Sequence, residues 1–393
     1  MDDGIYMDYS AGKPLEARCL EAMRPYFLKH FGNPSSLHLF GGEPRQALQR
    51  AREQVAQLIG ARLPEEILFT SGATESSNLA IKGVALRARG KNHVITSEIE
   101  HVSVLNICKF LENQGFKITH LPVDRFGMVD LERLTAEVRD ETILITLQYA
   151  NNEIGTLQPI AEVGELARSR GIYFHVDAVA AVGQVPIDVE REKIDLLSFS
   201  ANDLYGPKGV GALYVRKGTR VIPVMQGGGQ EFGLRSGTED IPGIVGLGVA
   251  AEMAREELEG EAQRLSRLRD KLIEGVTGRI RNSYLNGHPT RRLSNNAHFR
   301  FDYIEGESLI LSLSMLGVAA ATGSACTSKT LEPSRTLLRI GLTEEQAHGS
   351  LLFALGKSST EAEVDYILDH LPKVVDRLRA MSPFTPKEYF SGR

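Results

Sequence analysis

Residues 70–76 (TSGATES) combine small side chains with hydroxyl groups, directly after a predicted buried strand and at the start of a helical pattern. Small residues at such a place let backbone N–H groups approach an anion, and the helix dipole favours negative charge there. The segment therefore predicts a phosphate site. The alternative is a tight strand–helix turn with an ordinary N-cap.

Three other segments offer an acid, a thiol and a glycine loop. Residues 175–178 (HVDA) end a predicted strand, so Asp177 can pair with a protonated ring nitrogen or cap a helix. Cys326 lies among small and hydroxyl residues at 323–328 (GSACTS), which favours an accessible, reactive thiol over a core cysteine. The glycines at 227–229, followed by RSGT at 235–238, indicate close approach to a ligand or a flexible loop.

The composition excludes several classes of protein. The 393 residues include 45 Lys and Arg against 50 Asp and Glu, and this net charge of −5 disfavours binding to nucleic acid phosphates. No apolar run reaches the roughly 18–20 residues of a membrane span, and the start MDDGIYMDYS lacks the basic region of a signal peptide. Three cysteines without a CxxC pair indicate neither a disulfide framework nor a zinc site. We expect a cytoplasmic protein that binds no nucleic acid and no membrane.

The elements that position these segments follow from the apolar pattern. Short apolar runs alternate with helical patterns over the first 215 residues, which predicts a mostly parallel α/β sheet with helices on both faces. A long charged helix over about 251–276, a strand at 296–301 and a helix at 307–316 then follow. We predict a large α/β domain over 16–255 and a small α+β domain formed by 1–15 and 256–393. The strands predicted in the large domain lie at 67–70, 93–96, 117–121, 143–147, 173–176, 196–200 and 211–215.

Six motifs together resemble the cysteine desulfurases of the NifS/IscS type, in the order and spacing of that family and across nearly the whole chain. They are TSGATESSNLAIKG from Thr70, NNEIG from Asn151, HVDA from His175, YGPKG from Tyr205, RSGT from Arg235 and GSACTS from Gly323. The resemblance implies a fold-type-I, class-V aminotransferase-like homodimer that uses pyridoxal phosphate (PLP). Such enzymes take sulfur from cysteine as a persulfide and pass it to a scaffold for iron–sulfur clusters or to tRNA-modifying partners.

The resemblance also implies residues that bind the phosphate end of PLP. Thr74 and Ser200 would bind the phosphate, with Ala73 as a further contact. Thr238 would reach over from the second subunit.

Other residues would bind the ring of PLP and carry the sulfur. His101 would stack on the pyridine ring, Asp177 would pair with its nitrogen, and Asn152 would hold the ring hydroxyl. Cys326 would be the persulfide cysteine.

Several positions depart from the family pattern. Asp203 replaces the Schiff-base lysine, and a carboxylate cannot condense with an aldehyde, so PLP would bind without a lysine aldimine. Leu352 stands in place of the arginine that holds the substrate carboxylate, while Asn202 and Ala180 replace two cofactor contacts. Lys13 stands where the family has threonine, and we expect a surface or salt-bridged lysine there.

These departures predict an iron–sulfur cluster biogenesis protein without normal desulfurase activity. It would form a homodimer, dock an IscU-like scaffold through a tail at 381–390, and offer Cys326 as a ligand to a [2Fe–2S] cluster or as a sulfur acceptor. The alternative is an active cysteine desulfurase that uses noncovalently bound PLP, with Lys13 as proton carrier. Two further alternatives are an enzyme whose substrate has no carboxylate and a structural partner in which Cys326 is incidental.

Overall fold

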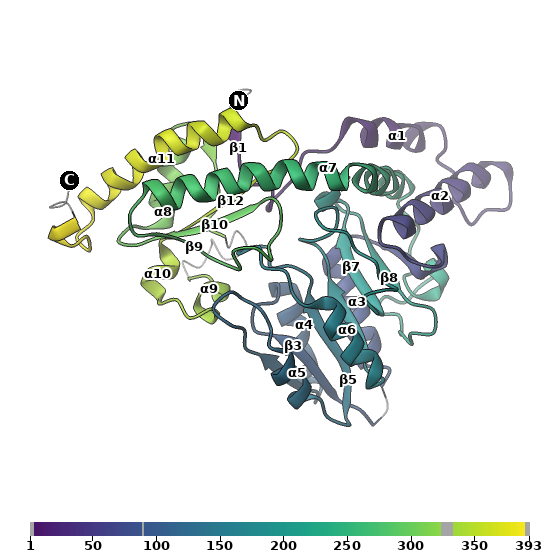
Figure 1. Cartoon of the computed structure of the whole chain (residues 1–393). Helices are drawn as coiled ribbons and strands as arrows, with labels where there is room; N and C mark the ends of the chain where they lie inside the picture. The colour runs from purple at the N-terminus through teal and green to yellow at the C-terminus, as the bar shows by residue number, and fades with distance from the viewer. Residues whose placement is uncertain (1–3, 89, 324–332, 390–393) are drawn as a thin grey trace.

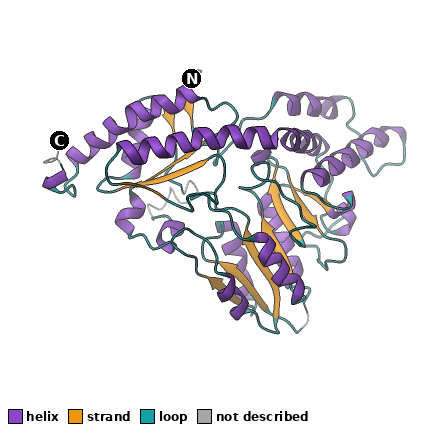
Figure 2. Cartoon of the chain, in the orientation of Figure 1, coloured by secondary structure: helices purple, strands orange, loops and turns teal. Residues whose placement is uncertain are grey.

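A seven-stranded sheet is the largest element of the computed structural model, which describes residues 4–88, 90–323 and 333–389. The strand order is β2-β8-β7-β6-β5-β3-β4, and Figures 1 and 2 show the sheet enclosed by helices. Only the pairs β2–β8 and β8–β7 are antiparallel among these described strands, so the predicted mostly parallel sheet is confirmed. The strands are β2 (Ile67–Thr70), β3 (His93–Ser97), β4 (Lys117–Leu121), β5 (Thr142–Gln148), β6 (Tyr173–Asp177), β7 (Leu196–Ser200) and β8 (Gly211–Val215).

Both faces of this sheet are buried, which explains the continuous apolar runs in its strands. Successive residues point to opposite faces: Val94 and Leu144 join one apolar cluster, whereas Ile95 and Ile145 join another. The first cluster includes residues of α3 (Ala73–Ala85) and α4 (Val102–Asn113), and the second includes residues of α2 (Gly42–Leu58) and α6 (Ile160–Ser169). The short α5 (Leu131–Glu137) lies between β4 and β5 in the chain.

A second, smaller core lies around a three-stranded antiparallel sheet in the order β12-β10-β9. The strand β1 (Ile5–Tyr6) pairs with β11 (Val318–Ala319), so the start of the chain joins this part of the molecule. Figure 1 shows α7 (Ile241–Arg279) running across the molecule, below α1 (Ala17–Leu28) and α11 (Glu361–Met381). The remaining elements here are β9 (Ser283–Leu285), β10 (Asn296–Phe301), β12 (Ser350–Ala354), α8 (Gly306–Ser314), α9 (Arg335–Arg339) and α10 (Glu344–His348).

The helix α7 is longer than the predicted 251–276. It begins at Ile241, and the Asp240 carboxylate caps it by accepting a hydrogen bond from the Gly243 N–H at 3.2 Å. Gly248 lies so close to α2 that a Cβ there would come within 2.8 Å of the Ala51 Cα. The apolar pattern did not predict this start, because several positions in the first turns of α7 are glycines that allow close packing and carry no apolar side chain. The predicted boundary between the two domains, after residue 255, falls inside α7, which continues through it without a break. The domain limits therefore remain a prediction.

Among the described helices, none is both long and apolar enough to cross a membrane.

Candidate active site

Asp177 ends β6 at the carboxyl edge of the large sheet, where ligand sites of such sheets gather. Its side chain is buried, and one carboxylate oxygen accepts a hydrogen bond from the Val179 N–H at 3.1 Å. Burial raises the pKa of Asp177, and the nearby carboxylate of Asp203 raises it further. Asp177 is therefore suited to pair with a positively charged ring, because such a cation would offset both the cost of burying the carboxylate and its repulsion by Asp203.

His101 faces the same place from the start of α4. Its Nδ1 accepts a hydrogen bond from the Ser103 N–H at 3.2 Å, so a neutral ring carries its proton on Nε2. The charge of a protonated His101 lowers the pKa of both Asp177 and Asp203, which opposes the effect of burial. His101 therefore lies near enough to Asp177 and Asp203 for its charge to act on both, while the roles toward PLP that the resemblance implies for His101 and Asp177 remain predictions.

The first turn of α3 has the form of an anion site. Its N-cap, Gly72, has φ +146°, a conformation that side chains disfavour, and a Cβ at this position would meet no atom within 4 Å. No described side chain accepts a hydrogen bond from the N–H groups of Ala73 and Thr74, and Thr74 itself is exposed. Gly211 on β8 allows the loop to pack, since a Cβ there would lie 2.6 Å from the Gly72 Cα.

Asp203 lies one short turn after β7 and already contacts a predicted phosphate ligand. The Ser200 hydroxyl donates a hydrogen bond to Asp203 Oδ2 at 2.5 Å. Burial raises the pKa of Asp203, while Lys13 and Ser200 lower it. Asp203 thus presents a carboxylate close enough to that of Asp177 for its charge to raise the pKa of Asp177.

Asn152 lies in a turn that connects the two parts of the molecule. The Asn151 side chain fixes this turn by accepting hydrogen bonds from the N–H groups of Glu153 and Ile154 at 3.0 and 2.9 Å. Asn296 of β10 donates to the Asn152 carbonyl at 3.4 Å. The half-buried Asn152 side chain is therefore held at the boundary between the large sheet and the small one.

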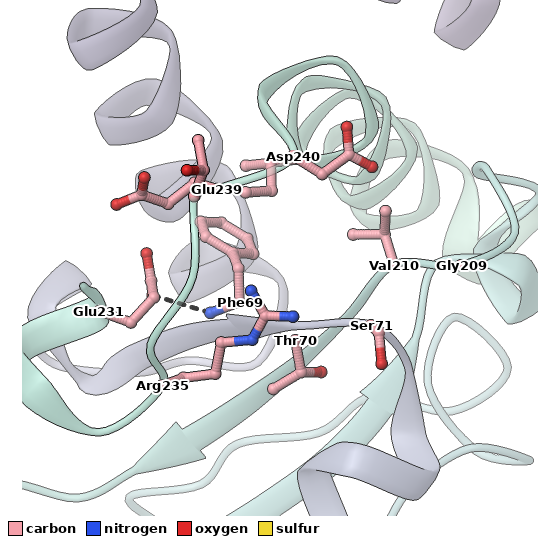
Figure 3. A pocket seen from close by; sticks show the side chains of 11 residues that line it. Phe69, Thr70, Ser71, Gly209, Val210, Glu231, Arg235, Glu239 and Asp240 are labelled. Atoms are coloured by element: carbon pink, nitrogen blue, oxygen red, sulfur yellow. Dashed lines mark hydrogen bonds between the residues drawn. The ribbon is translucent and has the colours of Figure 1, made fainter. Parts of the chain in front are cut away.

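Thr238 lies in a neighbouring cleft rather than beside Asp177 and His101. Thr238 is exposed and lines a cleft with Ser71 and Arg235, which Figure 3 shows beside the buried Glu231. The contact of Thr238 with PLP across a second subunit, which the resemblance implies, remains a prediction. Cys326 lies outside the described residues, so its predicted roles as persulfide carrier and [2Fe–2S] ligand remain predictions.

The sequence predicted a surface or salt-bridged lysine at position 13, and the structure places Lys13 in the interior. It is 6 % exposed, and its Nζ donates a hydrogen bond to the Asp203 carbonyl at 2.7 Å. Burial lowers the pKa of Lys13, and the charge of Asp203 raises it. The sequence could have indicated this contact, because Lys13 adds a positive charge and Asp203 adds a negative charge relative to the family pattern, as expected for two neighbouring residues.

Glu100, directly before His101, is a buried acid that sequence reasoning missed. Its carboxylate accepts a hydrogen bond from the Ser97 hydroxyl. Burial raises its pKa to about 8, and the charge of Asp177 contributes to this rise. Glu100 is therefore protonated at neutral pH. The sequence feature that could have indicated Glu100 is its position directly before His101, a residue already assigned to the site.

The aminotransferase class-V family matches residues 5–367 of this chain. The chain belongs to this family. It is 53 % identical over 379 residues to cysteine desulfurase IscS 1 of Archaeoglobus fulgidus, covering 96 % of this chain and 98 % of that protein. A cysteine desulfurase IscS of Methanosarcina thermophila is 53 % identical over 386 residues, covering 98 % and 95 %. A solved NifS-like protein, 37 % identical, superposes with a TM-score of 0.89 over 96 % of this chain and all of that one.

These similarities confirm the resemblance and the fold class predicted from the motifs. They also overturn the expectation of a member without normal desulfurase activity, because relatives matching nearly end to end carry the name cysteine desulfurase. That expectation was drawn from Asp203 and Leu352 as separate substitutions. It took the surroundings of both to be those of the family, whereas the structure places a new buried cation, Lys13, against Asp203.

Proposed function

We propose that this protein is a PLP-dependent cysteine desulfurase. L-cysteine would lose its sulfur to the Cys326 thiol, so that the substrate C–S bond breaks, an S–S bond forms, and Cβ gains a proton to give L-alanine. The observation that carries the proposal is the meeting of Asp177, His101 and the uncapped start of α3 at one edge of the sheet. The similarity to cysteine desulfurases over nearly the whole chain supports the same reaction.

The residues present fit PLP held without a covalent bond at position 203. The uncapped N–H groups and the open space at Gly72 suit its phosphate, together with Thr74. The buried carboxylate of Asp177 suits the ring nitrogen, and His101 and Asn152 suit the ring face and hydroxyl. When bound, PLP supplies the electron sink that lets the substrate C–S bond break.

Asp203 would move the protons that a lysine moves elsewhere in the family. A carboxylate cannot form the covalent link to PLP, but it can accept and return a proton. Burial raises the pKa of Asp203 from its ordinary value toward neutral pH, which makes it a better base. Its Oδ2 is oriented by the Ser200 hydroxyl at 2.5 Å, so Asp203 would take the proton from the substrate Cα and return one to it.

We further propose that the protein works as a homodimer and passes persulfide sulfur to an IscU-like scaffold. Large apolar side chains are exposed together on α1 and the segment after it, which supports cover by a second copy. They are Leu20, Phe27, Leu28, Phe31, Leu37, Leu39 and Phe40. In the tail at 381–390, Met381 and Phe384 are likewise exposed, which supports a role for this segment in docking a scaffold.

The test is anaerobic incubation of the PLP-loaded protein with L-cysteine and a reductant, with sulfide and L-alanine both measured. We expect equal amounts of the two products, and loss of both in Cys326→Ser. Asp203→Asn should bind PLP as the parent does and release little product. A parent protein that holds PLP but forms no L-alanine overturns the proposal, and full activity in Asp203→Asn removes the role given to Asp203.

A further inference from the structure

Lys13 is a buried cation that the proposed chemistry leaves without a role. Its backbone is fixed, because the Lys208 ammonium donates a hydrogen bond to the Lys13 carbonyl at 3.0 Å. The segment is held on either side by the Tyr9 N–H, which donates to the Ala354 carbonyl at 3.1 Å, and by the Glu16 N–H. Lys13 therefore has a defined position rather than that of a mobile surface side chain.

The Lys13 ammonium lies beside the proton-transfer group. It donates to the Asp203 carbonyl at 2.7 Å and lies 4.9 Å from the centre of the Tyr205 ring. Among the described residues this is its only hydrogen bond, so two of its three N–H groups donate to no described residue.

Leu352, where the resemblance places the arginine for the substrate carboxylate, packs against the same tyrosine. It is 1 % exposed and forms a small apolar cluster with Tyr9, Tyr205 and Ala354. Position 352 thus offers no charge, and the ring beside it carries the Lys13 ammonium on its face. The cation missing from β12 is supplied from the start of the chain.

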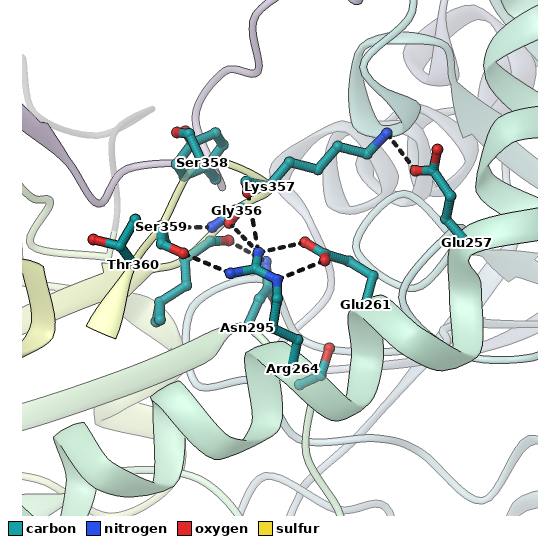
Figure 4. Close-up of polar contacts among 12 residues, drawn as sticks. Glu257, Glu261, Arg264, Asn295, Gly356, Lys357, Ser358, Ser359 and Thr360 are labelled. Atoms are coloured by element: carbon teal, nitrogen blue, oxygen red, sulfur yellow. Dashed lines mark hydrogen bonds and ion pairs between the residues drawn. The ribbon is translucent and has the colours of Figure 1, made fainter. Parts of the chain in front are cut away.

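A cation is needed here because the site already holds Asp177 and Asp203. The negative charge of Asp203 raises the pKa of Asp177, and a third carboxylate brought beside them would be repelled. Lys357 also approaches the Tyr205 ring, at 5.1 Å, but it is already paired with Glu16 at 3.0 Å and Glu257 at 2.7 Å, the second pair visible in Figure 4. Lys13 is the cation at this ring that no carboxylate within ion-pair distance satisfies among the described residues.

We propose that Lys13 binds the α-carboxylate of the amino acid substrate, in place of the arginine absent from position 352. This inference rests on the proposed function, since it assumes that an amino acid occupies the site. Lys13 then has two neighbours of opposite charge, the substrate carboxylate and Asp203, and orients the substrate Cα toward Asp203. This assignment predicts that a ligand with a carboxylate binds more tightly than one without it. It also predicts that this preference is lost when the positive charge at position 13 is removed.

The experiment compares the binding of L-alanine and ethylamine, which lacks the carboxylate, to the PLP-loaded protein by calorimetry. Lys13→Met should weaken L-alanine binding about tenfold or more and leave ethylamine binding unchanged, since a charge-assisted hydrogen bond is lost. Lys13→Arg should keep the preference for L-alanine. Lys357→Met is the matched control, and we expect its preference to equal that of the parent.

A rescue variant shows whether the charge itself matters. Lys13→Met with Leu352→Arg should regain part of the L-alanine preference, because a cation returns beside Tyr205. An unchanged ratio of the two affinities in a folded Lys13→Met protein overturns the assignment, as does a parent protein that does not bind L-alanine. Binding needs no turnover, so a shifted ratio without sulfide release would sink the proposed reaction and leave the assignment of Lys13 standing.

Discussion

Lys13 and Asp203 should stabilise the fold through their mutual attraction, and a double-mutant cycle can measure this. The perturbations are Lys13→Met, which keeps the length of the side chain, and Asp203→Asn, which keeps its shape. Each removes one charge of a buried pair whose members shift each other's pKa. Lys13→Met also removes the cost of burying an ammonium, so this single change can have either sign. The diagnostic quantity is therefore the coupling between the two changes.

The magnitude follows from the contact between the two residues. The Lys13 Nζ lies 2.7 Å from the Asp203 carbonyl, so the Asp203 carboxylate is only a few bonds away. At a separation of roughly 6 Å and an effective dielectric constant of about 20, the attraction is about 3 kcal/mol. Local relaxation and the Ser200 hydrogen bond reduce the part that a cycle reports, so we expect a coupling of about 1–3 kcal/mol.

The assay is urea unfolding of the four proteins at one fixed concentration. The chain has no tryptophan, so the transition is followed by circular dichroism of the helices. Lys208→Met combined with Asp203→Asn is the control. Lys208 is exposed, and its one hydrogen bond to the described residues goes to the Lys13 carbonyl, so its coupling to Asp203 should be near zero. The Lys13–Asp203 coupling should fall as the pH drops through the pKa of Asp203, which lies above 3.8. Additive effects at neutral pH would refute the pairing.

Three further predictions test the rest of the site. Gly72→Ala should destabilise the fold by about 1–3 kcal/mol and weaken PLP binding, because only glycine adopts φ +146° without strain; thermal unfolding and equilibrium dialysis with PLP measure both. Asp177→Asn should weaken PLP binding about tenfold or more, since a charge-assisted partner of the ring is lost; dialysis at the parent's affinity would contradict this. Glu100 has a pKa raised to about 8, so its contribution to stability is largest below its unfolded value of 4.5 and is lost as the pH rises through 8. Glu100→Gln should therefore be more stable than the parent at pH 8 by about 1 kcal/mol or more, and equal in stability at pH 4; equal unfolding curves at pH 8 would contradict the shift.

The strands were the part of the fold that the sequence predicted best. Those at 67–70, 117–121, 196–200, 211–215 and 296–301 coincide with the strands found, because each is an apolar run between clear turn signals. The start of α7 was missed, because its first turns contain glycines that serve packing against α2. Asp177 could be placed at the site from the sequence, since ligand sites gather at the carboxyl ends of parallel strands, whereas His101 was placed there only by the resemblance. The neighbours of Lys13 could not be, because 190 residues separate it from Asp203.

The substitutions at this site make chemical sense together rather than singly. Judged alone, Asp203 removes a covalent anchor and Leu352 removes a carboxylate partner, and the two suggest a site that has lost its reaction. In the folded chain the anion at 203 lies against a new cation at 13, and that cation lies on the aromatic ring against which Leu352 packs. One added lysine can therefore balance the charge of Asp203 and replace the cation missing at 352. Covalent attachment of PLP at position 203 is the one function that this exchange of charges does not restore, and noncovalent binding through Asp177, His101 and the start of α3 does not require it.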